Sequence, residues 1–307
     1  MATVVDPRAA DGRVPAFWRA LGLPGLIDVH VHFLPPRMLR RVWAYFDRVG
    51  PLTGVEWPIA YRWPDADRVA HLDAMGVRSY PALAYAHRPD MASDLNDWTL
   101  DFAAANPACV PSATFFPEPT APSYVDKALA RGARIFKLHV QVGDFDPRHP
   151  LLDPVWGRLA EQRVPVVVHA GSGPAPGAYT GPDRFGAVLE AHPTLRAVIA
   201  HLGAPEYREF LELAERYENV VLDTTMAFTR FFGSPARYPD DLLPRLRDLG
   251  LAGKVALGSD FPNIPYPYVE QLEALAALDF GDDWLRAVCW HNGVALTGVP
   301  TYPDHPR

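Results

Sequence analysis

Eight short apolar runs recur along the 307-residue chain. They are rich in Val, Ile and Leu and do not alternate strictly with polar residues, which is typical of strands buried on both faces of a parallel sheet. The runs are Leu26–Val31, Val77–Ala84, Val110–Phe115, Arg134–Val140, Pro165–His169, Ala197–His201, Val220–Asp223 and Val255–Ser259.

Longer segments with helical spacing of their apolar residues separate these runs. Asp65–Met75 carries Val69, Leu72 and Met75 on one face. The other helical segments are Asp94–Ala105, Ser123–Arg131, Asp153–Gln162, Asp183–Ala191, Pro205–Tyr217, Asp240–Leu249 and Tyr268–Leu278. Strands that alternate with helices predict a closed (β/α)8 barrel or a doubly wound sheet. Since a barrel needs about 250 residues, we expect residues 1–307 to form one TIM-barrel domain with residues 1–25 as an N-terminal extension.

The connection after the first apolar run, residues 33–63, is too long for an ordinary barrel loop. A helical face is expected from the spacing of Met38, Leu39, Val42, Trp43 and Phe46. Two interpretations stay open: a small helical insertion that packs on the barrel rim, and a lid over the site. In the second case Trp57 and Trp63 are expected to contact the substrate, because long loops at a barrel mouth often set specificity.

Composition narrows the class of partner. The formal net charge is −7 and no cluster of Lys and Arg stands out, which argues against nucleic acid. No apolar run reaches the ~20 residues of a membrane helix, and the N-terminus lacks the apolar core of a signal peptide. The two cysteines cannot form a disulfide framework. We expect a cytoplasmic protein that acts on a small molecule, without a membrane partner and with a homodimer as the default assembly.

Five polar residues end four of the apolar runs: His30, His32, His169, His201 and Asp260. Active sites of β/α barrels lie at the carboxyl ends of the strands, and residues i and i+2 of a strand point to the same side. Imidazole and carboxylate groups are the usual ligands of a catalytic divalent ion. One buried histidine alone is more often a hydrogen-bonded core residue, but five such groups at one end of the strands predict a metal site.

Five motifs around these residues resemble the amidohydrolase superfamily, in the branch that includes aminocarboxymuconate-semialdehyde decarboxylase. They are Ile27-Asp28-Val29-His30-Val31-His32, Lys137-Leu138-His139, Val167-Val168-His169-Ala170-Gly171, Ala200-His201-Leu202-Gly203 and Gly258-Ser259-Asp260-Phe261-Pro262. The resemblance extends from about Leu26 to Leu296. It implies a single metal, commonly zinc, with His30, His32, His169 and Asp260 as ligands.

The resemblance also implies the catalytic groups. Asp260 would take a proton from water and pass it to a leaving group, and His201 would polarise the scissile carbonyl or stabilise the oxyanion. Lys137 occupies the position of the carboxylated lysine of binuclear relatives, so a second metal is an alternative to a role in substrate binding. His139 is expected to contact the substrate or a ligand. Asp28 is expected to orient a ligand histidine, and Asp223 to be a structural or rim residue.

Three functions follow from this pattern. The leading hypothesis is hydrolysis of an amide, ester or lactone, a C–N or C–O bond, by metal-activated water. The alternative is metal-dependent, non-oxidative decarboxylation of an unsaturated or aromatic acid, a lyase reaction, for which Arg37, Arg62, Lys137 and Arg230 are candidate carboxylate contacts. A non-catalytic barrel that serves as a binding subunit would be marked by lost ligands, and none is lost.

Overall fold

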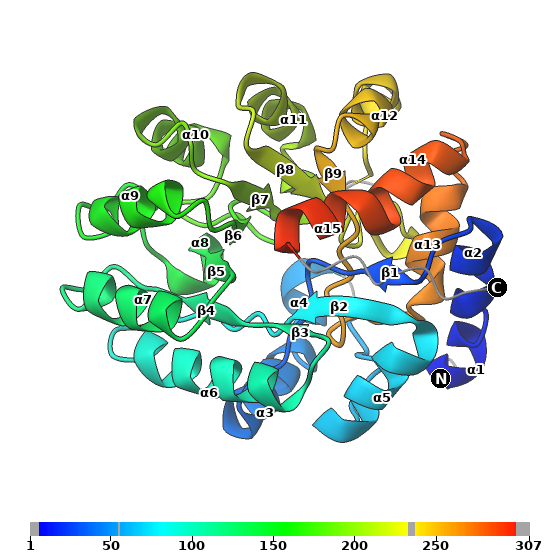
Figure 1. Ribbon diagram of the computed structural model, residues 1–307, viewed down its shortest axis with the longest axis horizontal. Coiled ribbons are helices and arrows are strands. Elements are labelled where there is room, and N and C mark those ends of the chain that lie inside the picture. Colours follow the sequence, from blue (N-terminus) through cyan, green and yellow to red (C-terminus); the bar gives the residue numbers. More distant parts are fainter. Residues whose placement is uncertain (1–5, 55, 233–236, 299–307) are drawn as a thin grey trace.

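The computed structural model describes residues 6–54, 56–232 and 237–298. Parallel strands lie at the centre of the molecule and helices surround them (Figure 1). The strands are β1 (Leu26–Ile27), β2 (Val77–Pro81), β3 (Cys109–Val110), β4 (Ser112–Thr114), β5 (Ile135–His139), β6 (Val166–His169), β7 (Ala197–Ile199), β8 (Val220–Asp223) and β9 (Val255–Ala256). Each predicted apolar run contributes to this set.

Pro111 divides one barrel strand into β3 and β4. Because proline has no N–H to donate, it interrupts the ladder of backbone hydrogen bonds. β3 pairs with β2, while β4 pairs with β5, and Pro111 still accepts a hydrogen bond from the backbone N–H of Arg134 at 2.8 Å. β3 and β4 therefore occupy one position, and the described residues hold the eight strand positions that the apolar runs predict.

The first and last strand positions are joined by backbone hydrogen bonds beyond the ends of β1 and β9. The N–H of Val29 donates to Leu257 O at 2.8 Å, the N–H of Asp260 donates to His30 O at 2.8 Å, and the N–H of His32 donates to Phe261 O at 2.7 Å. Val31 and Phe261 form a parallel bridge. The fold is therefore the predicted (β/α)8 barrel, and the segments that close it carry His30, His32 and Asp260.

The predicted helices are present, and their ends differ from the prediction by a few residues. They are α5 (Asp65–Met75), α6 (Ala92–Ala105), α7 (Ala121–Ala130), α9 (Asp153–Glu161), α10 (Pro182–Ala191), α11 (Tyr207–Arg216), α12 (Leu243–Leu251), which follows the 3-10 turn η3 (Asp240–Leu242), and α13 (Val269–Ala276). Further elements after α5 are α8 (Val140–Gly143), η1 (Ala200–Gly203), η2 (Arg230–Phe232), α14 (Asp282–Arg286), the π-helical segment η4 (Ala287–His291) and α15 (Asn292–Thr297).

The N-terminal extension contains two helices that pack on the barrel, α1 (Pro7–Asp11) and α2 (Val14–Ala20). The buried carboxylate of Asp11 accepts hydrogen bonds from Tyr61 Oη at 2.5 Å, His71 Nε2 at 2.8 Å and the backbone N–H of Val269 at 3.0 Å. Trp18 Nε1 donates to Met75 O at 2.9 Å. These contacts hold two helices of five and seven residues in place. Helices this short cannot be predicted from the spacing of apolar residues.

The segment after β1 forms α3 (Pro36–Phe46) and α4 (Gly50–Thr53). The helix predicted from the apolar spacing at Met38, Leu39, Val42, Trp43 and Phe46 is confirmed as α3. Further along, the backbone N–H of Ala60 donates to Ile264 O at 2.9 Å. The end of this insertion is therefore tied to the loop that follows Asp260.

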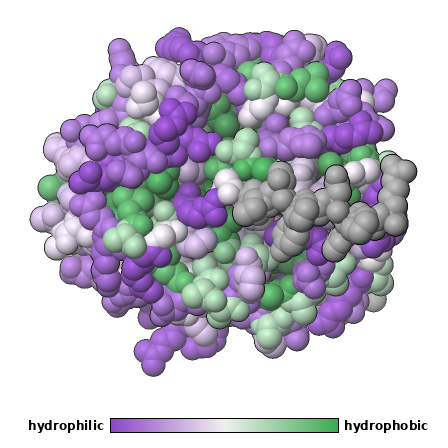
Figure 2. Space-filling model, in the orientation of Figure 1, coloured by the Kyte–Doolittle hydropathy of each residue, from purple (hydrophilic) through white to green (hydrophobic). Residues whose placement is uncertain are grey.

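Hydrophilic residues cover most of the outer helices in the view of Figure 2, and hydrophobic residues gather in smaller patches nearer the centre. The core fills the barrel and the layer beneath the helices, with Ile27, Phe136, Val167 and Leu222 fully buried. Among the described helices, none is both long and apolar enough to cross a bilayer.

Candidate metal centre

One cavity of about 960 Å³ opens at the carboxyl ends of the strands. Most of the predicted site residues line it: His30, His32, Trp57, Lys137, His139, His169, His201 and Asp260. His30 and His32 follow β1, Trp57 follows α4 and Asp260 follows β9, while the other four come from β5, β6 and η1. The barrel therefore brings residues from distant parts of the chain to one chamber.

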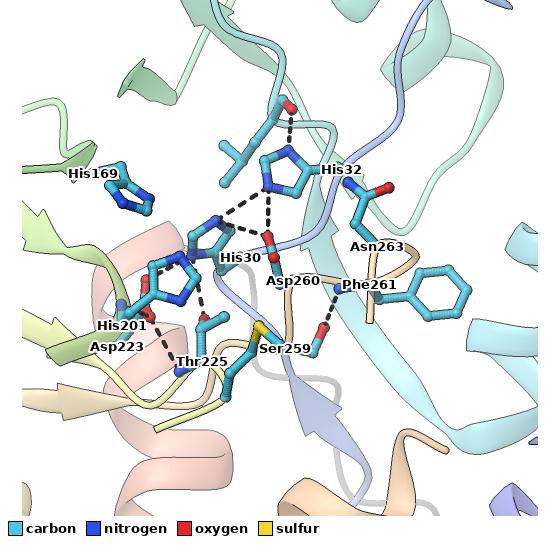
Figure 3. A network of polar contacts seen from close by, with 12 residues as sticks. His30, His32, His169, His201, Asp223, Thr225, Ser259, Asp260, Phe261 and Asn263 are labelled. Atoms are coloured by element: carbon cyan, nitrogen blue, oxygen red, sulfur yellow. Dashed lines mark hydrogen bonds and ion pairs between the residues drawn. The ribbon is translucent and has the colours of Figure 1, made fainter. Parts of the chain in front are cut away.

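His30, His32 and Asp260 form the tightest group in this cavity (Figure 3). Asp260 Oδ1 lies 2.8 Å from His32 Nε2 and 3.5 Å from His30 Nε2. The two Nε2 atoms are 3.2 Å apart. His30 and His32 are buried, and Asp260 is mostly buried. This closeness follows from the backbone hydrogen bonds that close the barrel at the same three residues.

The other ring nitrogen of each histidine is already engaged. His30 Nδ1 lies 2.8 Å from Asp223 Oδ2, and His32 Nδ1 lies 2.7 Å from Leu83 O. Both oxygens accept hydrogen bonds, so each Nδ1 carries the proton and each neutral ring presents an acceptor at Nε2. Two imidazole nitrogens and a carboxylate oxygen then face one another as acceptors. A divalent cation among them satisfies all three, so the donor set fits a metal.

Burial keeps the histidines in the form that binds metal. It lowers the pKa of His30 well below its ordinary value, and nearby Lys137 lowers it further. Burial likewise lowers the pKa of His169 to about 3 and lowers that of His201. Burial opposes the charge of Asp260, but the close approach of His32 and of the imidazoles of His30 and His201 outweighs it and brings the pKa of Asp260 below its usual range. Neutral imidazoles and an ionised carboxylate are what a divalent ion requires.

Asp223, at the end of β8, positions His30. Its side chain is fully buried, with Oδ2 on His30 Nδ1 and with Oδ1 accepting from the backbone N–H of His201 at 2.8 Å and of Thr225 at 3.2 Å. Of the two roles expected for Asp223, a structural and a rim residue, the contacts bear out the structural one. A carboxylate behind a ligand histidine fixes its tautomer and raises its basicity.

Asp28 does not contact a histidine side chain. Its Oδ1 accepts from the backbone N–H of His30 and of Ser259, each at 3.1 Å, and its Oδ2 accepts from Tyr268 Oη at 2.9 Å. Asp28, which is expected to orient a ligand histidine, holds the backbone of His30 and not its ring. It joins the segment of His30 to the segment of Asp260 instead.

His201 shares the centre with His30 and Asp260. Each of the three offers a ligand atom within 4.8 Å of the others. The backbone of His201 has φ 56° and that of Asp260 has φ 66°, a left-handed conformation that is unfavourable for residues with side chains and is common at functional sites. His201 therefore borders the position that His30 and Asp260 would give to a metal ion, at a longer range than the 2.8 to 3.5 Å among His30, His32 and Asp260.

His169 lies at the edge of the cluster, as Figure 3 shows. Its Nε2 is 2.9 Å from Gly173 O, and its ring stacks on His139 with centroids 4.0 Å apart. The register of β5 and β6, which sets His139 opposite His169, explains this pairing. The assignment of His169 as a ligand stays a prediction, and in the observed rotamer its Nε2 is occupied by a carbonyl.

Lys137 is fully buried, with Nζ 3.1 Å from His30 Nε2. Burial lowers the pKa of Lys137 to about 8, against the opposing attraction of Asp223 and Asp260. Lys137 is then mostly cationic at pH 7, with roughly a tenth in the neutral form, and a neutral amine is the form that can be carboxylated. A second metal and a role in substrate binding therefore both stay predictions for Lys137.

Gly258 is required by the close packing around His30. A β-carbon at this position would lie 2.4 Å from Thr225 Oγ1 and 2.9 Å from the β-carbon of His30. Both distances are shorter than side chains tolerate, so the strand before Asp260 can approach β1 and β8 only with glycine here.

The two tryptophans expected to touch substrate lie in different places. Trp57 lines the cavity, and its Nε1 donates to Asn263 O at 2.7 Å. Trp63 is absent from the cavity lining. Its ring packs near His71, with the Arg8 guanidinium 4.0 Å from the ring centroid. The expected substrate contact of Trp63 is therefore not supported, because the chain turns towards the N-terminal helices before reaching it.

Three arginines line the cavity mouth: Arg37 and Arg41 on α3, and Arg88 after β2. Within the described part of the chain, none of them forms an ion pair. Of the cationic candidates named from sequence, Arg37 and Lys137 reach the cavity, whereas Arg62 pairs with Asp47. Arg41 follows Arg37 by one helical turn, so helical spacing could have predicted that both line the cavity. No pattern in the sequence predicts the same of Arg88.

The amidohydrolase family model matches residues 27–298, whereas a search of curated proteins finds no match. An uncharacterized TIM-barrel protein from Bordetella bronchiseptica is similar in structure, with a TM-score of 0.68, 21% identity and coverage of 89% of this chain and 99% of that chain. So is a putative 2-pyrone-4,6-dicarboxylic acid hydrolase from Pseudomonas putida, with a TM-score of 0.60, 19% identity and coverage of 91% and 99%.

A 5-carboxyvanillate decarboxylase from Novosphingobium aromaticivorans, complexed with manganese and 4-hydroxy-3-methoxy-5-nitrobenzoic acid, has a TM-score of 0.61 at 16% identity and covers 91% of this chain and 97% of its own. At such identities the structural likeness shows the fold alone. The family model spans almost the whole barrel, from β1 to α15. The chain therefore belongs to the amidohydrolase family.

Proposed function

We propose that this chain is a metal-dependent hydrolase that cleaves a C–N or C–O bond of a small molecule, an amide, an ester or a lactone. The observation that carries the proposal is the meeting of three acceptors, His30 Nε2, His32 Nε2 and Asp260 Oδ1, within 3.5 Å of one another. His30, His32 and Asp260 would hold one divalent ion, with His169 as the fourth ligand after its Nε2 leaves Gly173 O. Zinc is the first choice, since imidazole and carboxylate groups are its usual catalytic ligands.

When bound, the ion would act as a Lewis acid and lower the pKa of water towards about 7. The other tasks fall to the chain itself. Asp260 is ionised, so its carboxylate can accept a proton from the attacking water and return it to the leaving group. His201 borders the same centre and can donate a hydrogen bond to the developing oxyanion. Lys137 Nζ, 3.1 Å from His30 Nε2, is within reach of a substrate oxygen beside the ion.

Decarboxylation of an unsaturated or aromatic acid is the second candidate. The arginines at the mouth, Arg37, Arg41 and Arg88, favour it, because they have no ion pair among the described residues and would attract a carboxylate. Lys137 offers a further cation deeper in the cavity. The same cationic groups would also bind the acid group of a hydrolase substrate. They therefore indicate that the substrate carries a carboxylate, and they do not distinguish hydrolysis from decarboxylation.

The test is a substrate screen with metal-loaded protein, with carbon dioxide release measured beside product formation. The panel contains esters, lactones, amides and aromatic acids. Hydrolysis without carbon dioxide, dependent on added metal and lost in Asp260→Asn, is the expected result. Release of carbon dioxide from aromatic acids would show that the protein is a decarboxylase, the second candidate, and not a hydrolase. Turnover that is unchanged by chelation and by Asp260→Asn would contradict both.

A further inference from the structure

The cavity has two differently lined parts. Its inner end holds the metal-site residues. Its outer end, which we call the outer chamber, carries apolar side chains beside the arginines of the mouth and the carboxylates of Asp90 and Asp94. The apolar residues are Met38, Val42, Tyr45, Phe46, Met91, Leu95 and Trp98. The metal centre and the outer chamber belong to one continuous cavity of about 960 Å³. A ligand that reaches the metal centre can therefore extend into the outer chamber.

Two helices build the walls of the outer chamber. On α3, Met38, Val42 and Tyr45 are four and three residues apart and so share one face. On α6, Leu95 and Trp98 are three residues apart and share the face that borders the cavity. The chamber is thus formed by one side of the insertion and one side of a barrel helix, which is a built surface rather than a chance opening.

Apolar side chains are left exposed at the mouth. In the described part of the chain only three large hydrophobic residues are strongly exposed: Tyr45 at 48%, Val142 at 46% and Leu251 at 49%. The first two line this cavity, whereas Leu251 lies at the end of α12. Apolar surface kept open to water beside a cavity indicates that a ligand covers it.

The wall beside the outer chamber is held in place. The ring of Phe46 packs on Trp57 with centroids 5.0 Å apart, and Trp57 packs on Phe231 at 4.5 Å. Trp57 Nε1 is anchored on Asn263 O, three residues after Asp260. A preformed apolar wall loses little conformational entropy on binding, which favours recognition of an apolar group.

We propose that the outer chamber binds a sizeable aryl or alkyl group of the substrate, so that the natural substrates are amphipathic molecules. The reacting group would lie at His30 and Asp260, while the apolar group would lie between α3 and α6. The inference rests on the proposed function, because it takes the metal centre as the reacting end. It goes further by naming the class of substrate: a compound whose apolar part is too large for the metal centre alone.

The test measures the binding of a series of straight-chain alkyl hydroxamates to the metal-loaded protein by calorimetry. The hydroxamate group ligates divalent metals and stays constant, while the tail grows from acetohydroxamate to decanohydroxamate. We expect the dissociation constant to fall about two- to fourfold for each added methylene group over the first several carbons. A dissociation constant that is independent of tail length, with acetohydroxamate still bound, would overturn the outer chamber and leave the proposed function standing.

Variants locate the binding of the tail. Tyr45→Ser and Trp98→Ala should reduce the gain per methylene group and leave acetohydroxamate binding unchanged. Leu251→Ser, an equally exposed position outside the cavity, is the matched control and should change neither. A gain per methylene group that persists undiminished in both cavity variants would overturn the proposal, since the tail would then bind elsewhere. If wild type does not bind acetohydroxamate but binds hydroxamates more tightly as the tail lengthens, the result would contradict the metal centre and support the outer chamber.

Discussion

At the centre of the site, hydrogen bonds behind the histidines decide which atoms face the metal position. Asp223 holds His30 Nδ1 and the Leu83 carbonyl holds His32 Nδ1. Both Nε2 atoms are thereby turned towards Asp260. The ability of His30 and His32 to bind a metal therefore depends on Asp223 and on the Leu83 carbonyl, which do not themselves face the metal position.

Asp223→Asn tests this dependence. The carboxylate uses one oxygen for His30 and the other for two backbone N–H groups, and an amide has only one acceptor oxygen. We expect metal affinity to fall about 10- to 100-fold, measured by competition with a chelator of known affinity. Asp11→Asn, at a buried carboxylate that does not line the cavity, is the control and should leave the affinity unchanged. Equal affinities in wild type and Asp223→Asn would show that Asp223 does not position His30.

The sequence predicted the types of residue at the strand ends, and it did so because each ends an apolar run. It did not predict which way the rings turn. His169 ends β6 as expected, but its Nε2 meets the carbonyl of Gly173, which belongs to a loop with no regular pattern. Asp223 also ends a strand, and its role depends on a contact with a residue 193 positions away. Such pairings come from tertiary structure, which periodicity does not encode.

At the scale of elements, the insertion after β1 divides into two parts with different roles. α3 and Trp57 border the cavity, whereas Tyr61 and Trp63 contact the N-terminal helix and α5. The apolar spacing predicted the helix. The aromatic content of residues 33–63 alone could not separate side chains that line the site from those that pack elsewhere.

Trp57→Ala should raise KM or lower kcat, because it removes a cavity wall and the hydrogen bond to Asn263 O beside Asp260. Trp63→Ala is the matched variant and should lower stability while the kinetics stay near those of wild type. Steady-state kinetics on the substrate found in the screen, together with metal content, check both. Equal kinetic effects of the two substitutions would contradict the division of the insertion.

Asp146 joins the loop after α8 to α10, because its carboxylate accepts hydrogen bonds from the side chains of Arg148 and Arg184. The hydrogen bond from the Arg148 side chain is the main cause that lowers the pKa of Asp146 from 3.8 to about 2. A carboxyl whose pKa is lower in the folded than in the unfolded state stabilises the fold above pH 3.8 and loses that contribution as the pH falls towards 2.

Asp146→Asn should therefore lower the free energy of unfolding by about 0.5–1 kcal/mol at pH 7, since the pairs are partly exposed to solvent. The difference from wild type should narrow as the pH falls from about 5 to about 3. Urea unfolding at several pH values measures it. A difference that stays constant across this range would show that the charge of Asp146 contributes nothing.

At the scale of the whole molecule, the barrel was predictable because its strands are buried on both faces and its helices are amphipathic. The N-terminal helices were not, because α1 and α2 are short and their stability comes from contacts with distant elements. Asp11 shows this most clearly, with partners in the insertion, in α5 and at the first residue of α13. The part of the expected N-terminal extension that the structure describes, residues 6–25, contributes to the packing of the barrel.

Asp11→Ala should destabilise the fold, because it leaves Tyr61 Oη and the backbone N–H of Val269 without their acceptor in a buried place. We expect a loss of about 1–3 kcal/mol in the free energy of unfolding, measured by urea denaturation. Asp6→Ala, an exposed residue that caps α1, is the comparison and should cost less. A loss in Asp11→Ala no greater than in Asp6→Ala would mean that the extension does not stabilise the barrel.

The central claim is that His30, His32 and Asp260 hold a metal ion. The most direct measurement is calorimetric titration of zinc and manganese into chelator-treated protein, with His30→Ala and His201→Ala alongside wild type. We expect about one tightly bound ion per chain in wild type, no tight binding in His30→Ala, and near-normal binding in His201→Ala. Absence of tight binding in wild type, or binding that survives unchanged in His30→Ala, would contradict the account.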